Sequence, residues 1–580
     1  MKIITLHVDY IKFKPIKKAL KSVKDLSSDE KKEKTIKEAL LVLTAVEKED
    51  KTEFVSELIK NIKDIASQVK VKNIVLYPYA HLSSNLSEPD KAVEILKNAE
   101  KELKKEFSVF SAPFGYYKEF ELKVKGHPLS ELSREISAEK DNQKKLKEEL
   151  SLKKEKDQDP KTILRSITKS TLDKSKLKSY DHRILGQEMD LFSFNDVSPG
   201  APFLHPNGLI IYNELISFMR SLWKKFSYKE ISTPFIYNNK LWKVSGHWDY
   251  YKENMFITTH EGKEAAIKPM NCPPAMLIYK IRPRSYKELP LRFAELGIVH
   301  RKELSGVLSG LFRVVKLTMD DAHIFCTEEQ LESEIMNIFE MFKIVYEDVF
   351  KFPYSVELST RPENLLGKKE EWDFAEKALE SALKKSKVKY SIKKGEGAFY
   401  GPKIDIHIKD SLGRSWQLTT IQLDMQMPKR FELKYTDKNG KEKTPLVIHR
   451  AIFGTIERFL GILLEHTKGR LPTWLAPIQV RVLSFTDRNI NHSQKIIDKI
   501  LKEMPNLRID SDFRSVPLDI KVKDAELMRI PYIVVIGDKE EKENMIAVRI
   551  KGDKKIKSLK LEEFIKNLNI EIETKAFKGF

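Results

Sequence analysis

Apolar and polar positions show two periodicities along the chain, one typical of strands and one typical of helices, and the periodicity changes from one segment to the next. Residues 1–13 alternate between apolar and polar, which predicts a half-buried strand. Residues 35–46 and 51–69 instead repeat apolar positions with helical spacing, which predicts two helices. Residues 73–77 form an apolar run that predicts a buried strand. The first part of the chain is therefore expected to mix strands and helices, as α/β or α+β.

The middle of the chain has a different pattern, in which residues 291–326 predict a long antiparallel hairpin. An apolar run leads into a charged turn at residues 300–303, and the chain then returns through residues 311–315. The hairpin would present Arg301 and Arg313 on one side, and guanidinium groups bind carboxylate or phosphate in a bidentate manner. The same pattern also fits a surface hairpin whose charges are solvated.

Helical spacing surrounds this hairpin, and a third pattern follows it. Residues 327–350 predict a helical insert, and residues 207–225 predict an amphipathic helix. The predicted buried positions of that amphipathic helix are Leu209, Leu215, Phe218, Leu222 and Trp223. Near the C-terminus strands alternate with helices, which implies a small mixed sheet with helices on its faces. The predicted strands are 479–483, 531–536 and 545–550, and the predicted helices are 492–504 and 561–568.

These patterns predict an α+β multidomain protein. We expect an N-terminal domain at residues 1–137, a charged linker at 138–178, a central domain at 179–472 and a C-terminal α/β domain at 473–580. A length of 580 residues agrees with three or four domains. Lys, Glu, Asp and Ser dominate the linker, which is typical of a solvated spacer.

The charge of the chain indicates the kind of partner it binds, and its cysteine content indicates its cellular compartment. The chain has 104 Lys and Arg against 85 Asp and Glu, a net charge of +19. Such an excess indicates a polyanionic partner, first of all nucleic acid, with a Lys-rich solvated surface as the alternative. The two cysteines, Cys272 and Cys326, predict a cytoplasmic protein. No apolar run approaches about 18 residues and no signal-peptide pattern is present, so no membrane partner is expected.

Two sets of residues are candidates for chemistry before any family is considered. Three N-terminal residues near a strand end or near glycine and proline turns either line a pocket or are ordinary loop polars: His81, Lys118 and Glu131. In the central domain Cys272, His323 and His449 lie too far apart in sequence for a local metal motif. Each of them alone also fits a buried cysteine or a core histidine.

The hairpin resembles the second signature motif of class II aminoacyl-tRNA synthetases in its threonyl form. The matching residues are His300-Arg301, Glu303, Ser305-Gly306, Phe312-Arg313 and Asp320-Asp321-Ala322-His323-Ile324-Phe325. Gly454 and Arg458, at the start of a predicted helix, resemble the third motif, and residues 207–225 with the strand after them resemble the first. The resemblance covers nearly the whole chain outside the linker. It implies a class II antiparallel-sheet catalytic core and a homodimer formed through the first motif.

The resemblance implies how this core binds ATP and the amino acid. Adenylate formation needs positioning and positive charge, and Mg²⁺ accompanies ATP. By resemblance Arg301 holds the α-phosphate and the amino-acid carboxylate, Arg458 the γ-phosphate, and Arg313 the adenine end. Lys403 is assigned to the catalytic residues on the same ground. The ATP- and substrate-binding residues implied in this way are Glu303, Asp321, Tyr400, Gln417, Thr420, Gln422 and Thr455.

Cys272, His323 and His449 fall at the zinc positions of the threonyl enzymes. Three protein ligands leave coordination positions open, as a catalytic Zn²⁺ site requires. One Zn²⁺ per subunit would then bind the amine and hydroxyl of L-threonine. Valine lacks that hydroxyl, and a site built for a hydroxyl rejects such an analogue by roughly 10⁴-fold or more.

Serine keeps the hydroxyl and lacks only a methyl group, which is worth about 10- to 200-fold in discrimination. A hydrolytic second sieve is therefore needed. The N-terminal domain resembles the editing domain of archaeal threonyl-tRNA synthetases, whose fold is similar to D-aminoacyl-tRNA deacylases. By matching motifs we assign the hydrolysis of mischarged seryl-tRNA(Thr) to His81, Tyr117, Lys118 and Glu131.

The C-terminal domain resembles the anticodon-binding domain of the threonyl, prolyl, histidyl and glycyl enzymes, with Glu540 and Arg549 at anticodon-reading positions. The chain departs from the family at Met319, where glutamine is expected, and at Ser515, where asparagine is expected. We expect a threonine–tRNA ligase that uses ATP, L-threonine and tRNA(Thr). The alternatives are a non-enzymatic tRNA-binding paralogue and a synthetase for serine or proline.

Overall fold

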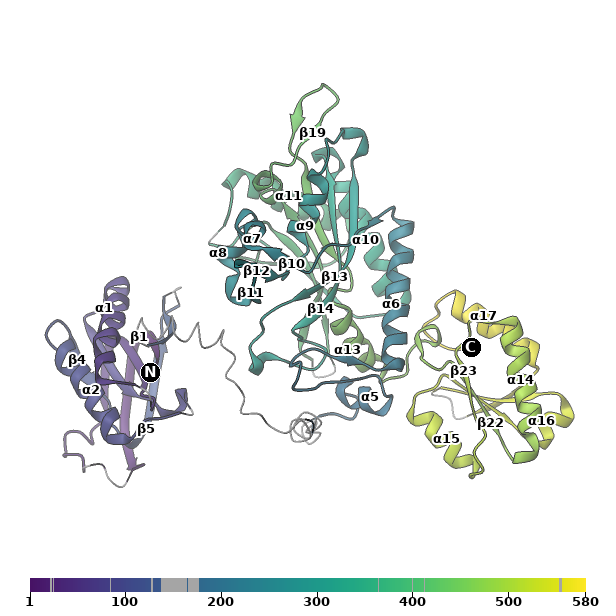
Figure 1. Cartoon of the computed structure of the whole chain (residues 1–580), viewed down its shortest axis with the longest axis horizontal. Helices are drawn as coiled ribbons and strands as arrows, with labels where there is room; N and C mark the ends of the chain where they lie inside the picture. The colour runs from purple at the N-terminus through teal and green to yellow at the C-terminus, as the bar shows by residue number, and fades with distance from the viewer. Residues whose placement is uncertain are drawn as a thin grey trace. The chain divides into compact units, whose positions relative to one another are not determined.

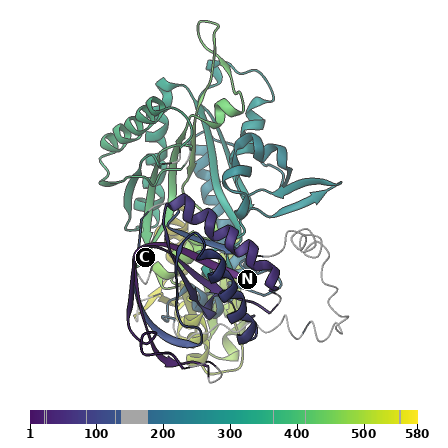
Figure 2. The same cartoon turned by 90° about the vertical axis from the view of Figure 1, so that its left-hand side faces the viewer.

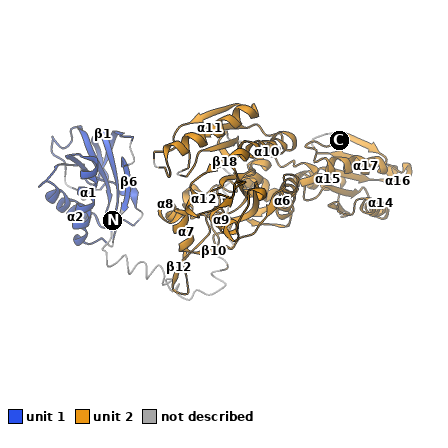
Figure 3. Cartoon of the chain, turned by 90° about the horizontal axis from the view of Figure 1, so that it is seen from above, with its two compact units in different colours: residues 1–160 blue, residues 161–580 orange. Residues whose placement is uncertain are grey.

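The computed structural model contains two compact units, residues 1–160 and residues 161–580 (Figure 3). In the part of the chain that the structure describes, no helix is long and apolar enough to cross a membrane. The predicted linker falls outside the described residues, apart from residue 164 and residues 177–178. The described residues are 1–20, 23, 25–48, 50–83, 85–126, 129–136, 164, 177–363, 365–398, 400–410, 413–551 and 555–580.

A six-stranded sheet forms the first unit, and helices α1 and α2 lie side by side against it (Figures 1 and 2). The long strand β1 pairs antiparallel with β2 on one side and with β5 and then β6 on the other. Strands β3 and β4 extend the sheet in parallel beyond β2. The elements are β1 (Lys2–Lys18), β2 (Lys34–Ala45), α1 (Val55–Val69), β3 (Asn73–Pro78), α2 (Pro89–Leu103), β4 (Ser108–Ser111), β5 (Tyr116–Val124) and β6 (Glu131–Glu135).

One predicted helix of this unit is wrong, whereas β1, α1 and β3 are confirmed. Residues 35–46 fall in strand β2. Leu40, Leu41 and Val42 are consecutive and fully buried, because Leu40 and Val42 pack into one hydrophobic cluster and Leu41 into another. A strand buried on both faces carries apolar residues without strict alternation, so its pattern cannot be told from that of a buried helix.

An eight-stranded sheet forms the centre of the second unit (Figure 1). Its strands pair antiparallel, except that β9 with β13 and β15 with β16 are parallel. In order across the sheet they are β16 (Tyr390–Lys393), β15 (Ser355–Ser359), β17 (Lys403–Lys409), β18 (Ser415–Asp424), β21 (Leu446–Ala451), β14 (Lys316–Cys326), β13 (Leu291–His300) and β9 (Lys229–Glu230).

The predicted hairpin is confirmed as β13 and β14, but its return strand begins later than expected. Residues 311–315 belong to the connecting loop, and β14 starts at Lys316. Leu311, Phe312 and Val314 are nevertheless buried, because the loop itself packs into the interior. Their apolar character therefore reflects a buried loop and not a strand.

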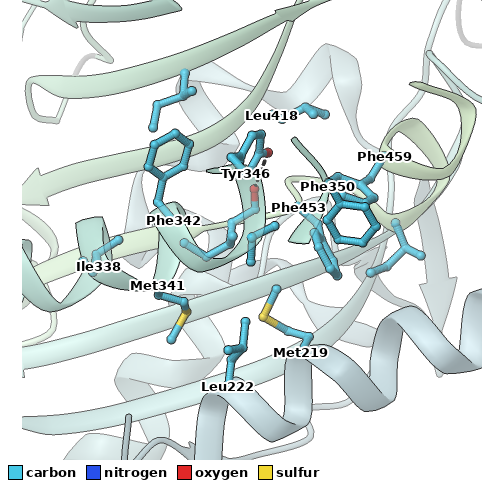
Figure 4. Packing of buried hydrophobic residues seen from close by; sticks show 14 of the residues in the cluster. Met219, Leu222, Ile338, Met341, Phe342, Tyr346, Phe350, Leu418, Phe453 and Phe459 are labelled. Carbon is cyan, nitrogen blue, oxygen red and sulfur yellow. Dashed lines mark hydrogen bonds between the residues drawn. The ribbon is translucent and has the colours of Figure 1, made fainter. Parts of the chain in front are cut away.

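The main hydrophobic core is formed by this sheet and by helices that pack against it. In Figure 4, Met219 and Leu222 lie opposite Met341, and Phe453 and Phe459 gather at the other end of the cluster. The predicted helices at 207–225 and 327–350 are confirmed, but Leu209 is 45% exposed and not buried as expected. The helices are α6 (Pro206–Lys225), α10 (Leu331–Lys343) with its π-helical continuation η7 (Ile344–Val349), α11 (Lys369–Ser386) and α13 (Ile456–Thr467).

Shorter elements complete this part of the second unit. Helix α5 precedes α6, and a three-stranded sheet of β10, β12 and β11 stands apart from the eight-stranded sheet. The helices are α5 (His182–Glu188), α7 (Asn239–Ser245), α8 (His247–Tyr250), α9 (Cys272–Lys280) and α12 (Met427–Arg430). The strands are β7 (Phe192–Ser193), β8 (Phe203–Leu204), β10 (Ile236–Asn238), β11 (Ile257–His260), β12 (Lys263–Ile267), β19 (Tyr435–Thr436) and β20 (Glu442–Lys443).

A five-stranded mixed sheet with helices packed against it ends the chain, as the alternating pattern predicted. Arg508 joins it to the preceding part, because its Nη1 donates to Glu214 Oε1 of α6 over 2.6 Å. The strands in order are β23 (Ile509–Asp512), β22 (Val480–Ser484), β24 (Tyr532–Ile536), β25 (Ile546–Ile550) and β26 (Ile556–Leu559). The helices are α14 (Ile490–Glu503), α15 (Leu518–Leu527), α16 (Asp538–Glu543) and α17 (Leu561–Glu573).

Candidate active site

A cavity of about 270 Å³ opens beside the central strands β14, β18 and β21 and the start of α13. Of the residues predicted for the catalytic core, all but one line it: Cys272, Arg301, Glu303, Arg313, Asp321, His323, Tyr400, Gln417, Thr420, Gln422, His449, Thr455 and Arg458. Lys403 is the exception, and its ammonium group is paired with Asp405 instead. Segments separated by nearly 200 residues in the sequence therefore contribute to one cavity.

A thiol and two imidazoles meet at this cavity. His323 on β14 and His449 on β21 are direct cross-strand partners, and their rings lie 5.0 Å apart. Cys272 comes from the first turn of α9. One ligand atom from each of the three lies within 4.8 Å of the others. The strand register and the position of α9 therefore bring together donors that the sequence separates.

The surroundings of His449 suit a metal ligand. Its Nε2 lies 2.9 Å from Asp424 Oδ2, which leaves Nδ1 buried without a hydrogen-bond partner among the described residues. A ligating histidine commonly binds a carboxylate through its second ring nitrogen, which orients the ring. One thiolate and two imidazoles are also the donors that Zn²⁺ prefers. The residues present therefore fit a zinc ion.

Burial and neighbouring charges act oppositely on the two histidines. Burial lowers the pKa of His323 well below its usual value, so this imidazole is neutral. Burial also lowers the pKa of His449, but Cys272 and the Asp424 carboxylate outweigh it and raise the pKa to about 10. Metal binding to ligands of this kind releases protons.

Asn271 orients Asp321, although no sequence pattern predicted a role for Asn271. Its Nδ2 donates to Asp321 Oδ2 over 2.6 Å. Burial raises the pKa of Asp321, while this hydrogen bond and Arg301 oppose the rise. A Cβ atom on Gly297 would lie 2.2 Å from Asn271 Nδ2, so only glycine leaves room for the amide. The one available signal was that Asn271 stands next to Cys272 in the sequence.

Arg458 is held by two backbone carbonyl groups. Its Nε donates to Phe312 O over 2.7 Å, and its Nη1 donates to Gln417 O over 2.8 Å. Burial lowers the pKa of Arg458 to about 10, and the positive charges of Arg301 and Arg313 add to that effect. Three guanidinium groups that repel one another favour a polyanion between them.

Three further hydrogen bonds fix other groups that line this cavity. Arg313 Nε donates to Glu303 Oε2 over 2.9 Å, so these two predicted residues are paired. Gln417 Nε2 donates to Asp405 Oδ1 over 2.5 Å and to Thr420 Oγ1 over 2.7 Å. Asp405 therefore organises Lys403, Gln417 and Thr420, although the sequence gave no reason to single it out.

In the first unit His81 and Lys118 are linked only indirectly, through a row of contacts with two tyrosines. The His81 ring lies 5.5 Å from that of Tyr79, which lies 6.3 Å from that of Tyr77. Lys118 Nζ stands 4.9 Å from the centre of the Tyr77 ring and donates to Pro113 O over 2.9 Å. Burial lowers the pKa of Lys118 to about 8 and raises that of Tyr77 to about 12.

The other two predicted editing residues do not join this group. Tyr117 is 64% exposed, because neighbouring residues of strand β5 point to opposite faces and Lys118 points inward. Lys118 lies opposite Pro15 of β1, whereas Glu131 lies opposite Leu6. Roughly 30 Å of extended strand separates those two β1 positions. Sequence motifs carry no information on this register.

Glu540 and Arg549, the predicted anticodon residues, both lie in the last sheet domain and already have partners. Glu540 Oε2 accepts from Gly537 N over 3.0 Å at the start of α16. Arg549 Nη2 lies 3.2 Å from Glu526 Oε1. Ser515 Oγ donates to Asp487 at 3.0 Å, in a different loop of the same domain.

Three family models match successive parts of the chain. Residues 1–136 match the archaea-specific editing domain of threonyl-tRNA synthetase. Residues 251–467 match the tRNA synthetase class II core domain (G, H, P, S and T). Residues 479–570 match the anticodon binding domain. The three expected kinds of domain are therefore confirmed.

The relatives decide between members of class II. A threonine–tRNA ligase of Clostridium tetani is 46% identical over 433 residues, which are 73% of this chain and 67% of the relative. The chain belongs to the threonyl-tRNA synthetase family. Another threonine–tRNA ligase, of Caldanaerobacter subterraneus subsp. tengcongensis, is 51% identical over 399 residues, 69% of this chain and 62% of that relative. The chain thus spans about two thirds of the length of these relatives.

A solved structure agrees with threonyl-tRNA synthetase membership. The RNA binding domain of threonyl-tRNA synthetase from Cryptosporidium parvum Iowa II has a TM-score of 0.64 and 39% identity, over 67% of this chain and 98% of that one. In this threonyl-tRNA synthetase family member, residues 137–250 lie outside all three matched segments. Helices α5 and α6 fall within that stretch.

Proposed function

We propose that the chain is a threonine–tRNA ligase, which activates L-threonine with ATP and transfers it to tRNA(Thr). The observation that carries this proposal is that one cavity holds both Cys272, His323 and His449 and the three arginines Arg301, Arg313 and Arg458. The first set suits recognition of a side chain through a metal, and the second suits a triphosphate. Few other reactions need both together.

The arginines supply positive charge at fixed positions, which is what adenylate formation requires. Arg458 is fixed by two carbonyl oxygens and takes the γ-phosphate. Arg301 lines the same cavity as Asp321 and holds the α-phosphate together with the amino-acid carboxylate. Arg313 lies at the adenine end, where its partner Glu303 accepts from the adenine amino group. Mg²⁺ enters with ATP.

Zn²⁺ bound by Cys272, His323 and His449 would supply a Lewis acid with open coordination positions for an amine and a hydroxyl. Asp321, oriented by Asn271, accepts a hydrogen bond from threonine in the same cavity. Valine lacks the hydroxyl and is rejected by roughly 10⁴-fold, whereas serine is rejected only about 10- to 200-fold. A second step that discriminates against serine is therefore needed.

We assign that step to the first unit, as hydrolysis of seryl-tRNA(Thr). The His81–Tyr79–Tyr77–Lys118 arrangement supports it, because a partly buried lysine of lowered pKa is typical of functional sites. Lys118 and His81 position the attacking water or the terminal ribose. The register of β1 supports no role for Glu131 beside Lys118 within one chain.

Three further properties are proposed. Exposed apolar side chains in and near the first motif support a homodimer through that motif: Phe203, Leu209, Phe235 and Ile236. The net charge of +19 and the C-terminal domain support tRNA as the polyanionic partner, with Glu540 and Arg549 reading the anticodon. A tRNA substrate and two free cysteines support a cytoplasmic location.

Threonine-dependent exchange of pyrophosphate into ATP tests the proposal. We expect exchange with threonine, weak exchange with serine and none with valine or proline, together with threonylation of total tRNA. A serine or proline synthetase would reverse that order. A tRNA-binding paralogue without catalysis would bind tRNA but exchange nothing, and either result would overturn the proposal.

A further inference from the structure

Asp181, His182 and Glu465 form a second buried group whose potential ligand atoms lie within 4.8 Å of one another. Their hydrogen bonds exclude a metal ion here. Leu311 N donates to His182 Nε2 over 3.0 Å, and a backbone N–H can only donate, so Nε2 is the unprotonated nitrogen. The proton is therefore on Nδ1, which donates to Glu465 Oε1 over 2.8 Å. Neither ring nitrogen has a lone pair left for a cation.

We propose that His182 is a positioning residue for ATP: it ties the loop at residues 301–315 to helix α13. This inference rests on the proposed function, because it concerns how that site holds its nucleotide. His182 belongs to α5, which lies outside the segments matched by the family models. The sequence indicated only that a domain begins near it.

The contacts form a closed circuit that starts and ends on α13. Glu465 and Arg458 both belong to this helix, seven residues or about two turns apart, and so lie on the same side of it. Glu465 binds His182, and His182 accepts from Leu311 N. The carbonyl oxygen of the next residue, Phe312, accepts from Arg458 Nε over 2.7 Å. The loop is thus attached to α13 at two points.

Packing supports the same role. The His182 ring lies 4.2 Å from the Phe312 ring, which lies 5.0 Å from the Trp416 ring on β18. Gly310 has φ +51°, and a Cβ atom there would lie 2.3 Å from His182 Nε2. The loop can approach the imidazole this closely only because residue 310 is glycine. His182 therefore lies directly behind Phe312, which lines the cavity.

The contacts of His182 hold the loop at residues 301–315 against α13 when no nucleotide is bound. Arg301 and Arg313 are on the loop, Arg458 is on α13, and all three line one cavity. Like charges repel, so without a triphosphate the loop and the helix would tend to separate. A neutral imidazole, held between a carboxylate and a backbone amide, resists that separation without adding positive charge. It thereby keeps Phe312 O and Arg458 in place for ATP.

The test is to measure KM for ATP and for threonine separately, by pyrophosphate exchange, in the full-length protein. His182→Ala is expected to raise KM for ATP about tenfold or more, since small displacements of binding groups are costly, and to leave KM for threonine within about twofold. His182→Gln is expected to restore most of the ATP affinity, because its amide oxygen can accept from Leu311 N. The matched control is His205→Ala, since His205 is also bonded through both nitrogens, to Asp190 and Ser193.

A second pair of variants keeps the test decisive if His182→Ala does not fold. Gly310→Ala alone should raise KM for ATP, because its methyl group displaces the imidazole. In the His182→Gln background Gly310→Ala should raise KM for ATP less than it does in the wild type, since the effects of substitutions at two residues in contact are not additive. Any of three results would overturn the inference. They are an equal rise in KM for ATP and for threonine, a His182→Gln variant no better than His182→Ala, and additive effects of the His182 and Gly310 substitutions. Failure of the wild type to exchange with threonine would instead overturn the proposed function.

Discussion

Asn271 Nδ2 and Asp321 Oδ2 lie 2.6 Å apart, and this hydrogen bond holds the one carboxylate predicted to meet the amino acid. Without it, burial would favour the protonated form of Asp321, because burial raises the pKa of this group. We expect Asn271→Ala to raise KM for threonine about tenfold with little change in KM for ATP, measured by pyrophosphate exchange. Asn239→Ala is the control, because Asn239 donates to Glu264 over 2.9 Å at the surface. Equal effects of the two substitutions would contradict this assignment.

Removal of Cys272 should abolish zinc binding. Cys272→Ala is expected to lower the zinc content from about one ion per chain to near zero, because two imidazoles alone bind the ion weakly. Discrimination against valine should then fall well below roughly 10⁴-fold. Elemental analysis and exchange with valine measure the two effects. The chain offers its other cysteine as the control: Cys326 is fully buried outside the cluster, and Cys326→Ala should keep the metal.

Arg458 should not be replaceable by lysine. Its planar guanidinium donates to two carbonyl oxygens, Phe312 O and Gln417 O, and an ammonium group cannot reproduce that fork. We expect Arg458→Lys to lower kcat/KM for ATP about 10²-fold or more. Arg488→Lys, at an exposed ion pair with Asp538, should leave the exchange rate unchanged. An active Arg458→Lys enzyme would mean that charge alone is sufficient at this position.

Lys118 should make stability depend on pH in a defined direction. Burial lowers its pKa to about 8 in the folded protein, whereas an unfolded lysine titrates near about 10.4. Between these values the unfolded chain binds more protons than the folded one, so the contribution of Lys118 to stability rises with pH. Below about pH 8 Lys118 is protonated in both the folded and the unfolded state. The free-energy cost of burying its charge is then at its full value and does not change with pH.

The variant Lys118→Met does not titrate, so the Tm of the wild type minus that of the variant should increase from about pH 8 to pH 10 and be flat below. Calorimetry of the intact chain measures this difference, and Lys123→Met, on the same strand, provides the comparison. The editing proposal has its own readout in the same variant. If seryl-tRNA(Thr) is hydrolysed as fast as by the wild type, Lys118 has no part in the reaction.

Arg549 should separate amino-acid activation from tRNA recognition. It lies in the C-terminal domain, where its ion pair with Glu526 is only partly shielded from solvent. We expect Arg549→Ala to reduce threonylation of tRNA about tenfold or more while pyrophosphate exchange is unchanged, because the contact is to tRNA alone. A parallel loss of both activities would indicate a folding defect instead.

Local patterns predicted the secondary structure best where burial is one-sided. Strand β1 and helices α1 and α6 each have one buried face, and all three appear where their periodicity placed them. The pattern failed at β2, whose residues are covered on both faces, and at residues 311–315, an apolar segment that is a packed loop. Periodicity reports which residues are buried, and it cannot distinguish the elements that bury them.

The amino-acid sequence by itself determined which groups of this protein can do chemistry. The motif arginines and the Cys272, His323 and His449 triad could be named because they stand at matching positions of the family motifs, and all of them line the cavity. Only the tertiary structure decided which groups meet. The register of β14 against β21 places His323 opposite His449, while the register along β1 keeps Glu131 from Lys118. The contacts of Asn271 and His182 likewise depend on segments far apart in sequence, whose packing no local pattern records.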